Sequence, residues 1–263
     1  MQFSKVITHD TAFHADEVMA VALLRHAGFQ FKVIRSRNPT LLADSLADPE
    51  VVVLDVGGIY DPLMLNFDHH QDASMMSAAG LIYDHFKNSI CPKEAQPFFG
   101  NFIASIDAID TNRDNIFAVW NTLPMGFRNT SSIIGGFNRE INDPAIQDEQ
   151  FQKAVDFTME IIKNEVHKAV KKAKSEADYS KRTILANNVA VFDEFSTVWK
   201  EKDEHTFAML PHANGWQIQS VDTTVAKVPE NIADCEGFVF RHASGFMAVV
   251  KDKNVALEFA KTL

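Results

Sequence analysis

The sequence predicts an α/β fold: a mostly parallel sheet with flanking helices, a long connecting helix and a smaller C-terminal α/β domain. Short apolar runs rich in branched residues alternate with helical patterns over the first 110 residues. A helical pattern without breakers follows, and strand patterns return after residue 180. Strands that alternate with helices are typical of parallel sheets. We therefore expect domains at residues 1–146 and 180–263, joined by a helix at 147–179.

The first half supplies the strands of the parallel sheet. We predict these strands at residues 5–8, 31–34, 51–56 and 63–67. The run at 51–56 is continuously apolar and branched, as in a strand that is covered on both faces. Apolar side chains at helical spacing predict helices at 16–26, 77–86 and 98–109. The stretch 111–147 is rich in turn residues and is expected to be irregular, with a short helix at 131–137.

The second half begins with the longest helical pattern of the chain. Apolar residues recur every three or four positions from Phe151 to Ala177, which predicts an amphipathic helix over 147–177. We interpret it as a connecting helix or as the seam of a homodimer. Strands are predicted at 183–195, 205–210, 216–221 and 246–251, and a last helix at 254–261. Asn214-Gly215 is a strong hairpin signal.

Composition narrows the class of protein. The formal net charge of −10 argues against broad binding to duplex nucleic acid, which depends on many phosphate contacts. No stretch approaches the roughly 20 apolar residues that cross a bilayer. Cys91 and Cys235 are too few and too far apart for a disulfide scaffold or a thiolate metal site. We expect a cytoplasmic protein, with no membrane partner and no leader before the first strand.

Histidine and aspartate cluster after three of the predicted strands. One cluster runs from His9 to Glu17, the second contains Asp55, and the third is Asp68-His69-His70. Asp16 alone would be an ordinary first-turn helix acid, and Asp55 alone a turn cap. Parallel strands, however, bring their carboxyl ends to one edge of a sheet, where ligands bind. The conjunction predicts a metal site at that edge.

The ligand types indicate which metal and which chemistry. Oxygen and nitrogen donors without thiolates favour Mn²⁺ or Mg²⁺, with Zn²⁺, Fe²⁺ and Co²⁺ as alternatives. Two such cations about 3.5–4 Å apart can activate a water and hold a phosphoryl oxygen. We therefore expect two Mn²⁺ ions and a phosphoester substrate.

Four motifs of the first 80 residues carry a resemblance to a known family. They are Thr8-His9 with Phe13-His14-Ala15-Asp16-Glu17, Leu54-Asp55-Val56-Gly57-Gly58, Asn66-Phe67-Asp68-His69-His70-Gln71, and Ser77-Ala78-Ala79-Gly80. In these motifs the chain resembles the melanocyte-proliferating-gene family. It is similar through them to the Asp-His-His phosphoesterase superfamily of exonucleases, oligoribonucleases, cyclic-dinucleotide phosphodiesterases and manganese pyrophosphatases. The resemblance continues at 106–110 and returns at 241–246.

The resemblance implies a set of metal ligands, with Asp55 as the bridge between two cations. The implied ligands are His9, His14, Asp16, Asp55, His69 and Asp110. Asp107 is the alternative to Asp110, because this chain reads Asp110-Thr111-Asn112 where the family tends to have Asp-Asn-Gly. His14 stands where many superfamily members have aspartate, and Thr11 stands where the family usually has glycine.

Further residues are expected to act on the substrate. By the resemblance, His70 would bond a phosphate oxygen or act as general acid, and Asp68 would orient a neighbouring imidazole. A smaller C-terminal domain would recognise the substrate. We expect its contacts to come from His242, Ser244 and Gly245, with Arg128 as a further phosphate contact.

The expected activity is that of a divalent-metal-dependent phosphoesterase. The resemblance implies a 3′-to-5′ exonuclease that acts on RNA or short oligonucleotides, with hydroxide activated by a dinuclear metal site. Its partner would be a short single-stranded nucleic acid or a nucleotide. Two alternatives remain open: a pyrophosphatase or nucleotide phosphatase, and a metal-binding regulatory protein without turnover.

Overall fold

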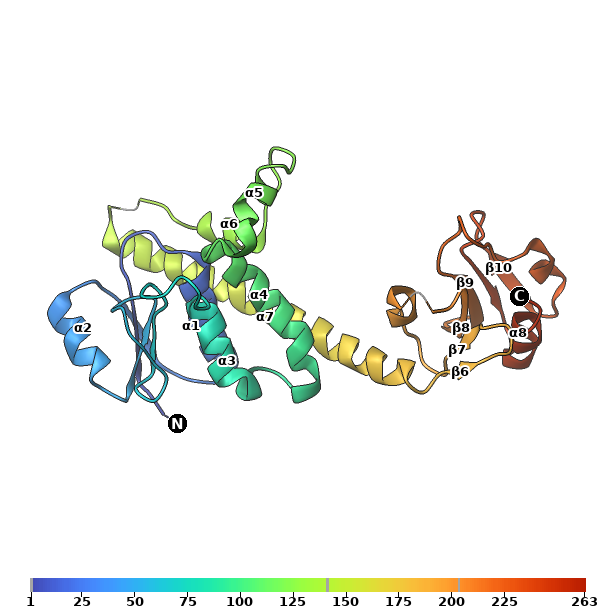
Figure 1. Ribbon diagram of the computed structural model, residues 1–263, viewed down its shortest axis with the longest axis horizontal. Helices are drawn as coiled ribbons and strands as arrows, with labels where there is room; N and C mark the ends of the chain where they lie inside the picture. Colours follow the sequence, from blue (N-terminus) through green and yellow to red (C-terminus); the bar gives the residue numbers. More distant parts are fainter. Residues whose placement is uncertain (1, 141, 203) are drawn as a thin grey trace. The chain divides into compact units, whose positions relative to one another are not determined.

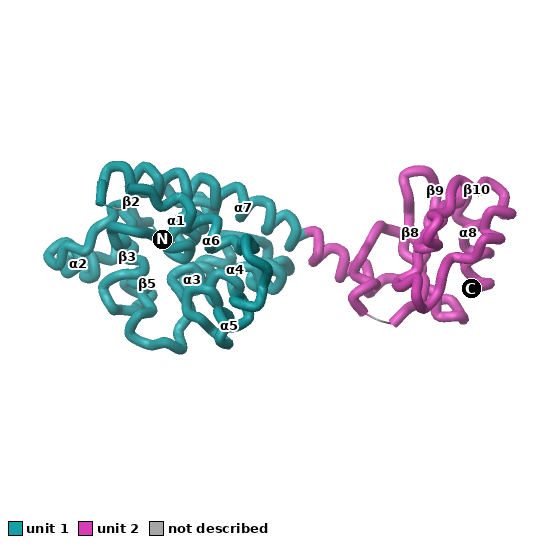
Figure 2. Tube along the Cα trace, turned by 90° about the horizontal axis from the view of Figure 1, so that it is seen from above, with its two compact units in different colours: residues 1–170 teal, residues 171–263 magenta. Residues whose placement is uncertain are grey.

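The computed structural model describes residues 2–140, 142–202 and 204–263 (Figure 1). The chain divides into two compact units, with the boundary between Val170 and Lys171 (Figure 2). Each unit contains a sheet of its own, and the expected α/β fold class is confirmed. Within the described ranges, no helix is long and apolar enough to span a membrane.

The sheet of the first unit is mostly parallel, as predicted. Its strands are β1 (Lys5–Thr8), β2 (Lys32–Arg35), β3 (Val51–Leu54), β4 (Tyr60–Asp61) and β5 (Asn66–Phe67). They lie in the order β2-β1-β3-β5-β4, and only β4 is antiparallel to its neighbour. The strand expected at 63–67 is shorter than predicted, because Leu65 has a φ of +57° in the turn that precedes β5.

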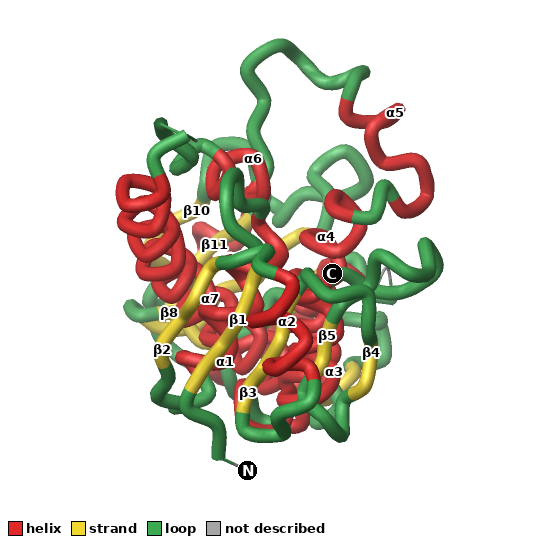
Figure 3. The backbone as a smooth tube through the Cα atoms, turned by 90° about the vertical axis from the view of Figure 1, so that its left-hand side faces the viewer, coloured by secondary structure: helices red, strands yellow, loops and turns green. Residues whose placement is uncertain are grey.

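Helices cover both faces of this sheet. Figure 3 shows α2 (Pro39–Leu46) on one side and α1 (Ala15–His26) and α3 (Ala78–Ile90) on the other. Leu42 and Leu46 of α2 pack against alternate residues of β3. Helix α1 is buried on every side from Ala15 to Leu24, so it forms the centre of the unit. This burial brings the first turn of α1 to the edge where the strands end.

Two of the next three helices correspond to those predicted at 98–109 and 131–137, and the one at 116–120 was not predicted. They are α4 (Gln96–Asp110), α5 (Ile116–Trp120) and α6 (Thr130–Gly135), with short 3₁₀ turns at Lys93–Ala95 and Arg113–Asn115. Helix α4 packs against α1 and α3. The segment between α4 and α6 is largely irregular, as expected, and three of its non-glycine residues and Gly126 have positive φ.

Helix α7 (Pro144–Tyr179) is the long helix that the sequence predicts. Asp143 caps its first turn, because its Oδ1 accepts hydrogen bonds from the backbone N–H groups of Ala145 (3.0 Å) and Ile146 (3.1 Å). Pro144 stands at the first helical position, where its missing N–H costs nothing. The boundary between the two compact units falls inside this helix.

The second unit is built on a six-stranded sheet in the order β10-β11-β9-β8-β7-β6. Its strands are β6 (Thr183–Ile184), β7 (Ala190–Val191), β8 (Phe207–His212), β9 (Gly215–Ser220), β10 (Phe238–Arg241) and β11 (Met247–Val250). Only β7 and β8 pair in parallel. Helix α8 (Lys253–Ala260) packs on this sheet through Ala256, Phe259 and Ala260.

Two local predictions for this unit need correction or refinement. The single strand expected at 183–195 is wrong: β6 and β7 form a tight antiparallel pair, and Asn188 turns the chain between them with a φ of +62°. The hairpin at Asn214-Gly215 is confirmed, although the turn is Ala213-Asn214 and Gly215 already pairs with His212.

Candidate metal centre

Parallel strands deliver three histidine- and aspartate-bearing segments to one edge of the first sheet. His9 follows β1, Asp55 follows β3, and His69 lies two residues after β5. Two helix ends complete the edge. Asp16 lies in the first turn of α1, and Asp110 is the last residue of α4.

These side chains form three overlapping groups in the described part of the chain. Within each group, the candidate ligand atoms lie within 4.8 Å of one another. The groups are His9 with His14, Glu17 and Asp55; Asp55 with His69 and His70; and His14 with Asp16 and Asp110. All six ligands implied by the resemblance are therefore gathered in one place, together with Glu17 and His70.

Asp55 lies at the centre of the cluster. Its Oδ2 is 3.3 Å from His9 Nε2, and its Oδ1 is 3.2 Å from His69 Nε2. Burial opposes ionisation of Asp55, but hydrogen bonding with His69 and His9 outweighs it and lowers the pKa of Asp55 to about 2. A carboxylate with a different imidazole on each oxygen has the geometry of a bridge between two cation positions.

His9 is held in a single orientation. Its Nδ1 donates to the backbone carbonyl of Asp10 at 2.9 Å, which leaves Nε2 facing the cluster. Nε2 lies 2.9 Å from Glu17 Oε1. Burial lowers the pKa of His9, but the hydrogen bonds with Asp55 and Glu17 raise it to about 10. His9 Nε2 therefore lies between two buried carboxylates, those of Glu17 and Asp55.

Glu17 is the functional candidate that sequence reasoning missed. Its carboxylate accepts the backbone N–H of His14 at 2.9 and 3.0 Å, which fixes the start of α1. The side chain is fully buried beside His9. The sequence held one cue, since Glu at the third helical position after a cap is a helix-start signal. Its proximity to His9 depends on the tertiary fold.

The environment of Asp16 fits a bound cation. The residue is fully buried, and neither carboxylate oxygen has a hydrogen-bond partner within the described ranges. Burial, together with the charges of Asp55 and Glu17, raises the pKa of Asp16 well above its usual range. Burial and the charge of Asp55 also raise the pKa of Asp110. A buried carboxylate without a partner is costly, and a coordinated cation would remove that cost.

Asp107 and Asp110 have different surroundings. His69 Nε2 lies 3.3 Å from Asp110 Oδ2, inside the cluster. Asp107 instead pairs with Arg113 at 2.6 Å and accepts the backbone N–H of Ser77 at the start of α3. Asp107 belongs to none of the three groups in the described ranges.

His70 and Asp68 form a pair at the rim of the cluster. His70 Nδ1 lies 2.7 Å from Asp68 Oδ1, and the His70 side chain is 64% exposed. Asp68 is buried, and its Oδ2 accepts the backbone N–H of Gly58 at 2.6 Å. His70 Nδ1 is also 3.6 Å from Asp55. The buried acid thus fixes an imidazole that reaches solvent beside the cluster.

The expected substrate contacts of the C-terminal domain lie in the turn between β10 and β11. His242 Nδ1 is 2.8 Å from Ser244 Oγ, and Gly245 has a φ of +76°. A Cβ at Gly245 would lie 2.8 Å from the Cβ of Lys227, so the turn requires glycine. Arg128 lies exposed in the loop before α6, where it donates to the carbonyl of Phe127 at 3.0 Å.

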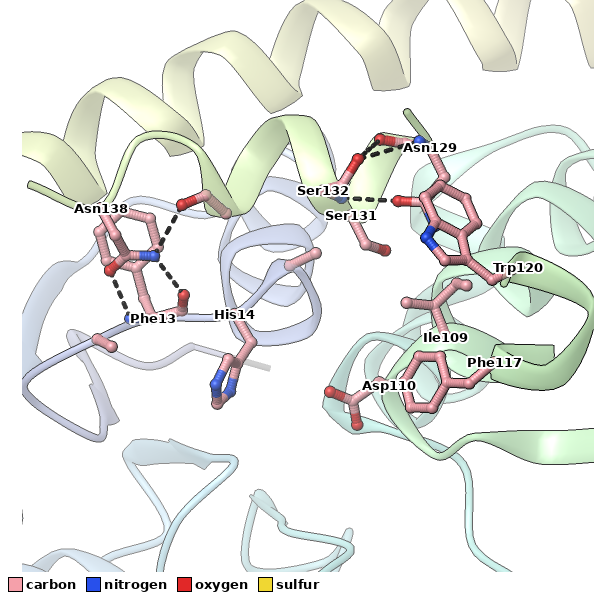
Figure 4. A pocket seen from close by; sticks show the side chains of 13 residues that line it. Phe13, His14, Ile109, Asp110, Phe117, Trp120, Asn129, Ser131, Ser132 and Asn138 are labelled. Carbon is pink, nitrogen blue, oxygen red and sulfur yellow. Dashed lines mark hydrogen bonds between the residues drawn. The ribbon is translucent and has the colours of Figure 1, made fainter. Parts of the chain in front are cut away.

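A pocket of about 590 Å³ adjoins the cluster in the first unit. Figure 4 shows His14 and Asp110 facing each other at its lower edge, with aromatic and hydroxyl side chains around the remaining walls. Since His14 and Asp110 also belong to one of the three ligand groups, the pocket is continuous with the cluster.

Two solved structures have a distant likeness to this chain. One is the pGpG-specific phosphodiesterase PggH from Vibrio cholerae, with 12% identity, a TM-score of 0.36, and coverage of 100% of this chain and 97% of that one. The other is RecJ in complex with Mn²⁺ from Thermus thermophilus, with 12% identity, a TM-score of 0.29, and coverage of 98% and 51%.

Related sequences cover nearly the whole chain. The MYG1 protein of Dictyostelium discoideum is 26% identical over 98% of this chain and 96% of its own length. The MYG1 protein of Chlamydia pneumoniae is 29% identical over 95% and 89%. The human MYG1 exonuclease is 32% identical over 40% of this chain and 35% of its own length. The family model MYG1_exonuc matches residues 5–231. The resemblance to the melanocyte-proliferating-gene family is thus confirmed, and the chain belongs to the family described as MYG1_exonuc, Uncharacterised protein family (UPF0160).

Proposed function

We propose that this protein is a divalent-metal-dependent phosphoesterase that acts as a 3′-to-5′ exonuclease on RNA or short oligonucleotides. The observation that carries the proposal is the fully buried Asp16 carboxylate, which has no hydrogen-bond partner in the described ranges and lies among further ligands. Membership of the family and the name of the human relative, MYG1 exonuclease, support the substrate class.

Two Mn²⁺ ions are the cations we propose. His9, His14 and Asp55 would hold the first cation, and Asp55 would also bind the second. The second would take its other ligands from Asp16, His69 and Asp110. The donor set supports this choice, because carboxylates and imidazoles without thiolates suit Mn²⁺.

Hydrolysis assigns separate tasks to the residues around the cluster. When bound, two divalent cations supply Lewis acidity, which favours ionisation of water and offsets the charge of the phosphoryl group. The water loses a proton to solvent, and its oxygen forms a bond to phosphorus as the bond between phosphorus and the leaving oxygen of the substrate breaks. His70, in its protonated form, would donate a proton to the leaving oxygen. Asp68 would keep the imidazole in this orientation.

The C-terminal turn would contribute to binding. His242 and Ser244 are exposed at the end of the β10–β11 hairpin. We propose that they bind substrate phosphates, with the tight turn at Gly245 placing them, and that Arg128 adds a further phosphate contact. Their hydroxyl, imidazole and guanidinium groups are suited to phosphate oxygens.

A substrate panel tests the proposal. The purified protein would be assayed with Mn²⁺, and with EDTA as the control, on a labelled oligoribonucleotide, a dinucleotide and inorganic pyrophosphate. The proposal expects Mn²⁺-dependent release of mononucleotides from the 3′ end. Release of phosphate from pyrophosphate alone would identify a pyrophosphatase. Bound manganese without turnover of any substrate would identify a regulatory protein.

A further inference from the structure

We propose that the pocket beside His14 and Asp110 binds the base of the terminal nucleotide that is cleaved off. The inference rests on the proposed function, because it takes the neighbouring cluster to act on a phosphoester. It adds a recognition site to that function: the substrate is selected by its base as well as by its phosphate.

The position of the pocket supports this assignment. His14 and Asp110 line the pocket, and together with Asp16 they also form a ligand group whose atoms lie within 4.8 Å of one another. A phosphate held at the cluster would therefore place the rest of its nucleotide at the edge of the pocket. The volume of about 590 Å³ lies within the range of small-ligand sites, which is roughly 300–1,000 Å³.

Aromatic and aliphatic side chains form one wall. Ile109 comes from α4, and Phe117 and Trp120 come from α5 (Figure 4). Phe117 is 44% exposed, so its ring is accessible to a ligand in the pocket. The Trp120 ring contacts that of Phe127 edge to face, with the ring centroids 5.6 Å apart. Such a wall offers a base a surface for stacking.

The pocket lining also carries a hydroxyl group that makes no hydrogen bond in the described part of the chain. Ser131 Oγ is shielded from solvent and makes no hydrogen bond within the described ranges. Because Ser131 Oγ is shielded from solvent, the side chain would have to rotate to turn its hydroxyl into the pocket, where it would gain a hydrogen bond with the polar edge of a base. Asn138, in contrast, is already occupied, because its Nδ2 donates to the carbonyls of Phe13 and Gly135. Ser131 is therefore the group that we assign to the edge of the base.

These walls match a nucleobase better than a second phosphate. Inorganic pyrophosphate has no apolar surface to bury against Ile109 or Phe117, and the described pocket lining contains no lysine or arginine. Stacking on an aromatic side chain contributes about 1–3 kcal/mol per base, largely independent of sequence. The pocket therefore predicts a general preference for nucleotides over plain phosphoesters.

The test uses two pairs of probes on the full-length protein with Mn²⁺. The first pair is an oligoribonucleotide and the same oligonucleotide with an abasic 3′-terminal ribose. The second pair, measured by calorimetric binding, is adenosine 5′-monophosphate and ribose 5-phosphate. We expect kcat/KM and affinity to be about 5- to 150-fold higher for the member that carries a base.

Substitutions in the pocket test whether it causes the preference for probes that carry a base. Trp120→Ala should reduce kcat/KM for the intact substrate to nearly the abasic level. Ser131→Ala should remove a smaller part of the preference. Phe195→Ala is the matched control, because it removes a ring that is 52% exposed in the second unit and should keep the full preference.

The two proposals fail in distinguishable ways. If no substrate is hydrolysed, the proposed function is overturned, and the binding pair still decides the present inference. If hydrolysis occurs but the abasic substrate is cleaved equally well, the base pocket is overturned and the phosphoesterase stands. Preference that persists in both Trp120→Ala and Ser131→Ala also overturns the pocket assignment.

Discussion

At the scale of single residues, two positions of the metal centre have strained backbones. Thr11 has a φ of +66° and Asp55 a φ of +55°, in the left-handed region. Aspartate tolerates this region, but a β-branched threonine does so rarely. The strain at Thr11 gives a physical reason to expect that glycine would fit this position better. Arg35 holds the turn in place through its hydrogen bond to the Thr11 carbonyl at 2.5 Å.

Thr11→Gly is predicted to stabilise the protein. Left-handed strain costs about 1–3 kcal/mol, while the extra freedom that glycine gives the unfolded chain costs about 0.4–1 kcal/mol. We expect the free energy of unfolding to rise by about 1 kcal/mol in denaturant titrations. Thr40→Gly, within α2, is the control and should lower it. A loss of stability in Thr11→Gly would contradict the strain assigned here.

Substitutions at Asp55 and His70 should affect metal binding and turnover differently. Asp55→Asn keeps a residue that tolerates positive φ but removes the charge shared by His9 and His69. Manganese affinity, measured by calorimetry, should fall by more than about 100-fold. His70→Ala should keep its manganese and lose about 10²- to 10⁴-fold in kcat, the usual contribution of a general acid.

The control for the histidine variant is His167→Ala, since His167 is exposed on α7, away from the cluster. It should change neither property. Loss of manganese from His70→Ala would show that His70 is a ligand, which its 3.6 Å distance from Asp55 allows geometrically. The division of tasks between His69 and His70 would then be wrong.

At the scale of elements, the segment before α1 is fastened to the segment after α6. Asn138 Oδ1 accepts the backbone N–H of Phe13 at 2.9 Å, and Asn138 Nδ2 donates to the carbonyl of Phe13 at 2.7 Å. Gln147 of α7 reaches the same Oδ1 at 3.3 Å. His14 is the next residue after Phe13. The hydrogen bonds between Asn138 and Phe13, which we call the Asn138 clasp, therefore fix the backbone position from which the His14 side chain extends.

Asn138→Ala is predicted to weaken both the fold and the metal site. The backbone groups of Phe13 lose their partners, which should lower the free energy of unfolding by about 2 kcal/mol. Manganese affinity should fall about tenfold as His14 loses its fixed position. Asn187→Ala is matched, because its side chain also donates to a backbone carbonyl, that of Ala260 at 2.8 Å. This control should lose stability and retain affinity, and equal losses of affinity would exclude a specific clasp.

The sequence predicted the elements that have strong periodicity. The run of branched apolar residues predicted β3, and the long helical repeat of apolar residues predicted α7. Strand β10 was missed, because its exposed and half-buried residues lack alternation. Helix α2 was missed although Asn38 and Pro39 form a cap and a first position, since its eight residues give little periodicity. Short elements depend on the neighbours they pack against, which no local pattern contains.

At the scale of the whole molecule, the metal centre also could be predicted only where local sequence patterns determine which residues become neighbours. The positions of His9, Asp55 and His69 after predicted strands indicated that they would lie close together, because parallel strands bring their carboxyl ends to the same edge of a sheet. The role of Glu17 required knowing that α1 packs with its first turn beside β1. The pocket proposed to bind a base could not be predicted, because its lining depends on the fold of residues 109–138, where the sequence predicted irregular structure with one short helix.

All candidate ligands lie in the first unit, so cation binding should stabilise that unit selectively. A ligand at 100 times its dissociation constant adds about 2.7 kcal/mol to the stability of the part that binds it. Hydrogen exchange with mass spectrometry should therefore slow about 100-fold in peptides of α1 and β3 when Mn²⁺ is added. Peptides of β8 and β9, which belong to a separate core, should be unaffected. The Asp55→Asn variant should lack the effect, and equal protection of β8 and β9 would mean that the two units unfold together.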